Sequence, residues 1–222
     1  MPEFIKKSVD PYCFRLIAPS APKLYLSAGI HGNETSGPVC LSELIKEPAF
    51  FEGIDVTIFP ILNPWGYEHN VRRNLHNRDL NRDFKHMQQA ETQKHIKLIE
   101  GDYNMVLCLH ESRNSDGVFI YKPKKNNRYD IMEDVLLAMS DIMPIDSKHT
   151  RGKIKIEPGI IRDVKYKEKH LTEAIYFANK GIDAFTIEVP HNVSMQLRID
   201  TYRAGIKEAI SVLKLISVSG YR

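Results

Sequence analysis

The apolar stretch Leu24-Tyr-Leu-Ser-Ala-Gly-Ile30 runs directly into His31-Gly-Asn-Glu34, and this junction indicates both a fold class and a site. An apolar run of this length is typical of a buried strand, and Gly32 lets the backbone turn sharply into the helix that follows. Ligand sites of open α/β sheets lie in the crevice at the carboxyl ends of such strands. We therefore expect the side chains of His31 and Glu34 to point into one crevice.

Strand-like and helix-like segments alternate along the rest of the chain, which is typical of α/β proteins. The predicted strands are 14–18, 24–30, 56–60, 105–110, 117–121 and 184–189. The predicted helices are 35–47, 85–100, 128–143, 169–179 and 200–218. This order predicts one α/β domain with a mixed, mostly parallel twisted sheet and helices on both faces. The segment 146–169 departs from this alternation and is predicted to be an irregular insertion, in which lysine and arginine outnumber acidic residues.

A second predicted strand, 105–110, also ends on a potential metal ligand, His110. Catalytic zinc sites take three protein ligands from histidine, glutamate, aspartate and cysteine and leave a fourth position open for water. His31, Glu34 and His110 supply three such ligands, which predicts one zinc ion per chain. The spacing of His31 and Glu34 alone would be weak support. The same His-x-x-Glu spacing occurs at His170 and Glu173, where it is typical of a solvated pair on a helix.

Further motifs lie between and after these ligands: Asn63-Pro-Trp-Gly66, the arginine-rich segment that ends in Asp79-Leu-Asn-Arg-Asp-Phe84, and Thr186-Ile-Glu-Val-Pro190. With them the chain resembles the zinc carboxypeptidase superfamily, including murein peptide amidases and the succinylglutamate desuccinylase/aspartoacylase branch. The matching motifs span residues 23 to 190 in the family's order. The resemblance implies a zinc carboxypeptidase-like domain of the phosphorylase/hydrolase-like type.

The resemblance also implies roles for single residues. His31, Glu34 and His110 match the family's zinc ligands. Glu188 matches the general base that takes a proton from the zinc-activated water and passes it to the leaving amine. Arg72 aligns with the arginine that steadies the oxyanion of the tetrahedral intermediate, and the neighbouring arginine fits the family's spacing less well.

Carboxylate recognition is implied for Asn81 and Arg82, which align with the pair that grips the substrate's terminal carboxylate. The planar fork of arginine fits a carboxylate bidentately. Arg73 and Arg78 lie in the same basic segment, for which a solvated loop is the alternative. The expected substrate is therefore a peptide or an acyl-amino acid with a free carboxylate.

Two other substrate-binding positions follow from the same resemblance. Tyr166 aligns with a tyrosine on a mobile loop that closes over the substrate, although Tyr121, Tyr129 and Tyr176 compete for this role. Glu173 falls where carboxypeptidases place a residue at the base of the specificity pocket, which would favour a basic side chain. An exposed helical glutamate is the alternative for this position.

Two enzyme functions and one binding function remain open. The leading prediction is a metallocarboxypeptidase that cuts short peptides or cell-wall-derived peptides beside a free carboxylate. The closest alternative is an N-acyl-amino-acid amidohydrolase of the succinylglutamate desuccinylase/aspartoacylase kind, which uses the same metal chemistry. A binding module that keeps the fold and the metal is disfavoured by Glu188 and Arg72, because a pure binder has little need of a base. A nucleotide-binding protein lacks support, because no Gly-x-Gly-x-x-Gly motif or phosphate-loop lysine follows the first strands.

Composition argues against two other classes. The net charge of +3 comes without the concentrated basic stripe of a nucleic-acid-binding protein. No segment approaches the roughly 20 apolar residues that span a membrane, and the N-terminus has no apolar signal core. The three cysteines, Cys13, Cys40 and Cys108, lack paired metal spacing and are expected to be buried, reduced thiols. We therefore expect a cytoplasmic protein without nucleic-acid or membrane partners.

Overall fold

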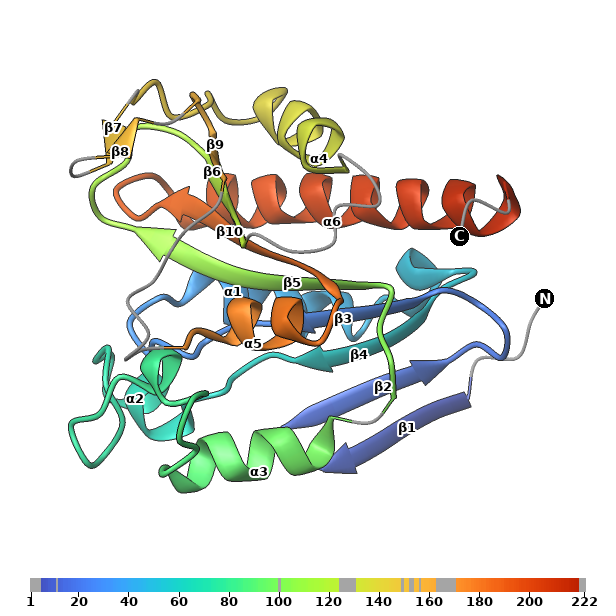
Figure 1. The fold of residues 1–222 in the computed structure, drawn as a ribbon, viewed down its shortest axis with the longest axis horizontal. Coiled ribbons are helices and arrows are strands. Elements are labelled where there is room, and N and C mark those ends of the chain that lie inside the picture. The colour runs from blue at the N-terminus through green and yellow to red at the C-terminus, as the bar shows by residue number, and fades with distance from the viewer. Residues whose placement is uncertain are drawn as a thin grey trace.

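One eight-stranded sheet forms the centre of the computed structural model, which describes residues 5–10, 12–99, 101–123, 131–148, 150–151, 154–155, 157–162 and 171–219 (Figure 1). In spatial order its strands are β1 (Ile5–Asp10), β2 (Cys13–Ile17), β4 (Asp55–Phe59), β3 (Lys23–Ser27), β5 (Met105–Ser112), β10 (Asp183–Pro190), β6 (Phe119–Lys122) and β9 (Ile160–Arg162). The pairs β4–β3, β3–β5, β5–β10 and β6–β9 are parallel, and the other three pairs are antiparallel. The predicted mixed, mostly parallel sheet is confirmed.

Every predicted helix has a counterpart among the described elements, with shifted ends. The helices are α1 (Ser36–Leu44), α2 (Pro64–Glu68), α3 (Ala90–Leu98), α4 (Ile131–Ser140), α5 (Glu173–Asn179) and α6 (Met195–Ser219), with 3-10 turns η1 (Pro48–Phe51) and η2 (Leu80–Arg82). Caps explain where some of them begin. The Thr172 hydroxyl accepts a hydrogen bond from the Ile175 N–H, which fixes the start of α5. In the same way, the Asn63 side chain accepts from the Gly66 N–H at the start of α2.

The segment 146–169, for which the sequence predicts irregular structure, contributes strands where it is described. β7 (Thr150–Arg151) and β8 (Ile154–Lys155) form a separate two-stranded ladder. β9 instead joins the edge of the main sheet and pairs with β6 in parallel. The apolar residues of β9 are buried, so this part of the segment belongs to the core.

Helices cover both faces of the sheet, and strand alternation sends neighbouring side chains to opposite faces (Figure 1). In β5, Leu107 and Leu109 belong to the larger core cluster, together with residues of α1, α4 and α6. Val106 and Cys108 belong to a second cluster, together with residues of α5. All three cysteines of the chain are buried free thiols.

The parallel strands bring distant residues to one edge of the sheet. In the ladder between β5 and β10, His110 is the register partner of Glu188. β3 is the other neighbour of β5, and the loop after β3 carries His31 and Glu34. The three segments that carry the predicted metal ligands and the predicted base therefore end side by side.

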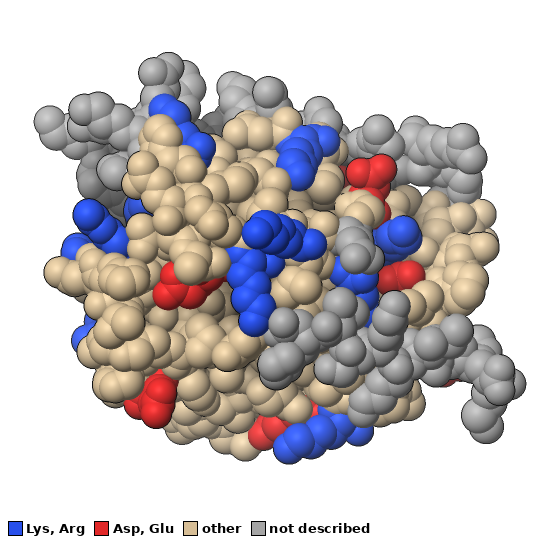
Figure 2. Space-filling view, turned by 90° about the horizontal axis from the view of Figure 1, so that it is seen from below, with Lys and Arg blue, Asp and Glu red and all other residues tan. Residues whose placement is uncertain are grey.

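The surface in Figure 2 shows Lys and Arg side chains interspersed with Asp and Glu side chains. Among the described residues, no helix combines the length and the hydropathy that crossing a bilayer requires.

Candidate active site

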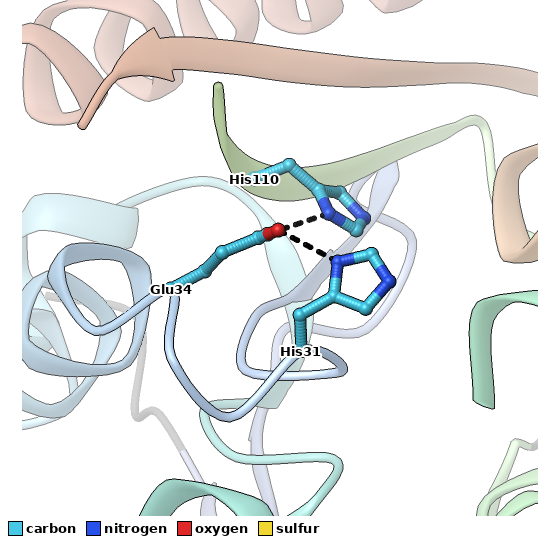
Figure 3. A group of neighbouring side chains, drawn as sticks. All are labelled: His31, Glu34 and His110. Carbon is cyan, nitrogen blue, oxygen red and sulfur yellow. Dashed lines mark hydrogen bonds and ion pairs between the residues drawn. The ribbon is translucent and has the colours of Figure 1, made fainter. Parts of the chain in front are cut away.

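Three potential metal ligands converge at the carboxyl edge of the central strands. His31, Glu34 and His110 are buried, and one ligand atom from each lies within 4.8 Å of the other two. The Glu34 carboxylate points between the two imidazoles (Figure 3). Its Oε1 lies 2.7 Å from His31 Nδ1, and its Oε2 lies 2.8 Å from His110 Nδ1.

These residues fit a zinc ion. Two imidazole nitrogens and one carboxylate form a donor set of catalytic zinc sites. The Nδ1 atoms of both histidines face Glu34, so these nitrogens and the carboxylate are the atoms that would hold the ion. The other nitrogen of His31, Nε2, lies 3.1 Å from Asp79 Oδ1. A carboxylate behind a histidine ligand orients the imidazole ring and raises its basicity.

The local charges also suit a cation. Burial by itself would raise the pKa of Glu34, but His31 and His110 hold this pKa well below its usual range. Burial would likewise raise the pKa of Asp79, and the contacts with His31 and the charge of Arg72 keep it well below its usual range. For His110, burial lowers the pKa, but the nearby Glu34 carboxylate outweighs this effect and raises it. Both carboxylates are therefore ionised at neutral pH and place negative charge at the site.

Two glycines let the motifs around the site come together. A Cβ atom added to Gly32 would lie 1.9 Å from the backbone carbon of Gly66. A Cβ atom added to Gly66 would in turn lie 2.3 Å from Asn63 Nδ2. The loop that carries His31 and Glu34 thus packs directly on the start of α2, and only glycine permits this approach.

Seven of the predicted site residues line one cavity of about 340 Å³. Its walls include the three metal-binding candidates, together with Arg72, Asn81, Arg82 and Glu188. The cavity also receives side chains from the ends of β5, β6 and β10 and from the start of α5.

Arg72 reaches the metal-binding candidates from the loop after α2. Its Nη2 and Nε atoms donate to Asp79 Oδ2 at 3.0 and 3.3 Å, and its Nη1 lies 3.4 Å from Glu34 Oε1. The Arg72 side chain remains 42 % exposed, so part of the guanidinium is accessible from the cavity. Asp79 therefore holds both His31 and Arg72 in place.

The predicted carboxylate clamp is connected to both α5 and the metal-binding candidates. Asn81 Oδ1 accepts a hydrogen bond of 2.9 Å from the backbone N–H of Glu173, at the first turn of α5. This contact turns Asn81 Nδ2 toward His110, whose Nε2 lies 3.4 Å away. Arg82 Nη1 donates to the Asn81 carbonyl at 2.7 Å. Asn81 lines the cavity, and because its amide nitrogen carries two N–H groups, one can face His110 while the other remains for a ligand.

The Glu173 side chain does not take the predicted position at the base of the pocket, and it is not an exposed helical glutamate either. It is 1 % exposed and does not line the cavity. Its carboxylate accepts hydrogen bonds from Tyr25 Oη at 2.5 Å and from Ser27 Oγ at 2.9 Å, and it lies 3.1 Å from His95 Nε2. Burial would raise the pKa of Glu173, but His95 and the two hydroxyls lower it below its usual value. Glu173 is thus an interior anion that ties α5 to β3 and α3.

The tyrosine predicted to close over the substrate, Tyr166, lies outside the described residues, as does its competitor Tyr129. Of the other two candidates, Tyr121 lines the cavity from β6. Tyr176 does not line it and packs against Phe84 and Phe177 instead.

Three residues with roles at the site were not singled out by the sequence: Asp79, Glu111 and His191. Asp79 lies inside the Asp-Leu-Asn-Arg motif, which could have indicated it. Glu111 follows His110 directly, and its buried carboxylate accepts hydrogen bonds from His191 and Arg198. No pattern in the sequence pairs Glu111 with His191, because their contact depends on the ladder between β5 and β10.

Comparison with known proteins finds one family model and several solved structures that are similar to this chain. The model of the succinylglutamate desuccinylase/aspartoacylase catalytic domain matches residues 20–117. A search of curated proteins found no match. Among solved structures, a candidate metallopeptidase from Shewanella denitrificans OS217 has a TM-score of 0.78 at 19 % identity, over 94 % of this chain and 84 % of that one.

Two further solved structures cover longer proteins. A metallo-carboxypeptidase from Pseudomonas aeruginosa, in complex with (2-guanidinoethylmercapto)succinic acid, has a TM-score of 0.67 at 18 % identity, over 95 % of this chain and 61 % of that one. The cell shape determinant protein Csd4 of Helicobacter pylori, in its apo form, has a TM-score of 0.68 at 18 % identity, over 96 % of this chain and 54 % of that one. At such identities, the likeness establishes the fold.

The matched family model and the shared fold together confirm the resemblance to the zinc carboxypeptidase superfamily, with its succinylglutamate desuccinylase/aspartoacylase branch. Over residues 20–117 the family model supports a hydrolase of the succinylglutamate desuccinylase/aspartoacylase kind, and the solved structures add the metallocarboxypeptidase-like fold.

Proposed function

We propose that this chain is a zinc-dependent metallocarboxypeptidase that hydrolyses an amide bond next to a free carboxylate, with one zinc ion per chain. The observation that carries this proposal is the convergence of His31, Glu34 and His110 on the cavity that Glu188 and Arg72 also line. A metal-binding group, a candidate base and a candidate oxyanion donor thus share one space.

Each group of residues in the cavity would have a separate role in the reaction. Zinc bound by the three ligands would supply a water of lowered pKa and would polarise the scissile carbonyl. Glu188, next to His110 in the sheet ladder, would take the proton from the attacking water and deliver it to the leaving nitrogen. Arg72, held by Asp79, would offer its guanidinium to the oxyanion.

Substrate binding would use Asn81 and Arg82. A carboxylate only accepts hydrogen bonds, and the Asn81 amide group at the cavity has a second N–H besides the one that can face His110. Arg82 would add a charge-assisted contact. Short peptides or cell-wall-derived peptides with a free carboxyl terminus fit this arrangement.

A deacylase is the second candidate, and the family model matched over residues 20–117 favours it. An N-acyl-amino-acid amidohydrolase would use the same metal, the same base and the same clamp. A metal-retaining binding module is the non-enzyme alternative, and the shared cavity of Glu188 and Arg72 argues against it. The three buried free thiols agree with a reducing, cytoplasmic compartment.

The experiment compares three compounds that share one leaving amino acid: a short peptide acid, its C-terminal amide and an N-acyl-amino acid. We expect hydrolysis of the peptide acid that is lost on zinc chelation and restored by zinc. Amidation should lower kcat/KM more than tenfold, because each charge-assisted bond contributes about 1.5–3 kcal/mol. Arg82→Ala should remove this preference, and Arg82→Lys should not restore it, because an ammonium cannot reproduce the guanidinium fork. Equal cleavage of acid and amide by the wild type would overturn the clamp, and cleavage of the N-acyl-amino acid alone would establish the deacylase.

A further inference from the structure

The imidazole of His191 enters the candidate active site just beyond the end of β10. Its backbone N–H donates to the Ser112 carbonyl at 2.8 Å, which extends the pairing of β10 with β5. The side chain lines the same cavity as Glu188 and is 36 % exposed.

A buried carboxylate holds the ring in place. Glu111 Oε2 accepts from His191 Nδ1 at 2.5 Å and from Arg198 Nη1 at 2.6 Å. Its other oxygen accepts from the backbone N–H and the hydroxyl of Ser36, at 2.7 and 2.5 Å. The Glu111 side chain is 0 % exposed. Contacts from α1 and α6 thus fix the carboxylate, and the carboxylate fixes the imidazole.

These contacts determine which hydrogen-bonding group His191 offers. An ionised carboxylate only accepts hydrogen bonds, so the proton of the neutral imidazole lies on Nδ1. The guanidinium of Arg198 balances the charge of Glu111. The lone pair of the imidazole is then on Nε2, which has no hydrogen-bond partner among the described residues. His191 therefore presents a hydrogen-bond acceptor on the wall of the cavity.

The sheet places this acceptor away from the carboxylate clamp. In β5, His110 and Glu111 are consecutive, so their side chains point to opposite faces of the sheet. The clamp residue Asn81 is held by the first turn of α5, on one face. Glu111 and His191 are tied to α1 and α6, on the other face. A substrate whose leaving carboxylate is in the clamp would extend its acyl half across the metal-binding residues toward His191.

We propose that His191 Nε2 accepts a hydrogen bond from an N–H group in the acyl half of the substrate. This inference rests on the proposed hydrolase function and names its substrate class. An aminoacyl group has such an N–H, whereas a simple acetyl or succinyl group has none. His191 would therefore be a specificity-determining residue that favours peptides over simple N-acyl-amino acids.

The test uses two substrates that differ in one group: an N-acetylglycyl-amino acid and the matching levulinoyl-amino acid, in which a methylene replaces the N–H. The wild type should prefer the acetylglycyl compound by about tenfold in kcat/KM, the size of one good neutral hydrogen bond. His191→Phe should remove the preference by slowing only the acetylglycyl compound. His191→Gln, which keeps an acceptor, should retain part of it. No preference in the wild type, an unchanged preference in His191→Phe, or an equal loss for both compounds would overturn the proposal.

Binding of the same two compounds to Glu188→Gln separates this inference from the proposed function. A tighter binding of the acetylglycyl compound, lost when His191→Phe is added, supports the role of His191 even if the wild type hydrolyses neither compound. That result would count against the hydrolase alone. Hydrolysis of both compounds without any preference would count against His191 alone.

Discussion

Replacing the buried carboxylate of Glu173 should destabilise the whole domain. The carboxylate accepts hydrogen bonds from Tyr25 and Ser27 and contacts His95, and it is buried. Glu173→Gln keeps the shape but removes the charge and one accepting oxygen. Hydrogen bonds to a charged group contribute about 1.5–3 kcal/mol each, and breaking a buried ion pair costs about 3–5 kcal/mol. We expect a loss of about 3 kcal/mol, which for a domain of this size lowers Tm by roughly 6–12 °C.

The assay is thermal unfolding at pH 7, followed by circular dichroism, with Glu43→Gln as the control. Glu43 is an exposed glutamate of α1, so its variant should unfold at nearly the wild-type temperature. The pKa of Glu173 in the folded protein is below its ordinary value of 4.5. Its stabilisation is therefore present above pH 4.5 and is lost as the pH falls through the folded-state pKa. The gap between wild type and Glu173→Gln should shrink below pH 4.5.

Two outcomes would refute this account of Glu173. One is a Tm for Glu173→Gln that equals that of Glu43→Gln at pH 7. The other is a gap that stays constant or widens as the pH falls below 4.5.

Three further predictions concern the site itself. Glu188→Gln should lower kcat by about 10²–10⁴-fold while zinc content and KM stay near the wild-type values, whereas an unchanged kcat with a raised KM would make Glu188 a binding residue. Gly32→Ala should lower both zinc content and Tm, because its Cβ would lie 1.9 Å from the Gly66 backbone; full zinc content with an unchanged Tm would argue against this. His31→Ala and His110→Ala should each lose most of the zinc that elemental analysis finds in the wild type after dialysis, and stoichiometric zinc in both variants would contradict the ligand assignment.

The metal-binding candidates could be predicted from the sequence because their signals are local. A strand, a glycine and the spacing of His31 and Glu34 place two donors in one turn, and parallel strands bring His110 to the same edge. The mixed sheet could be predicted for a similar reason, since the apolar runs of β3, β4, β5 and β10 alternate with helical segments.

The rest depended on contacts between distant parts of the chain. The Glu173 carboxylate is buried against Tyr25, Ser27 and His95, which lie on β3 and α3. The sequence of its own helix therefore gives no sign of this burial. The edge strand β9 has too few residues for a period-2 pattern to identify it.

The contacts that hold the active-site side chains in place also join distant parts of the chain. The contact of Glu111 with His191 joins residues 80 positions apart and exists only because β5 and β10 are neighbours. Asp79 contacts His31, which lies 48 positions away in the sequence, and Arg72, which lies 7 positions away.

The most direct test of the central claim is an anomalous difference map from crystals of the wild-type protein grown with zinc, collected on both sides of the zinc absorption edge. The account predicts one strong zinc peak per chain, within bonding distance of Nδ1 of His31, Nδ1 of His110 and the carboxylate of Glu34. A map from zinc-saturated crystals with no peak among these three side chains, or with the zinc bound to other residues, would contradict it.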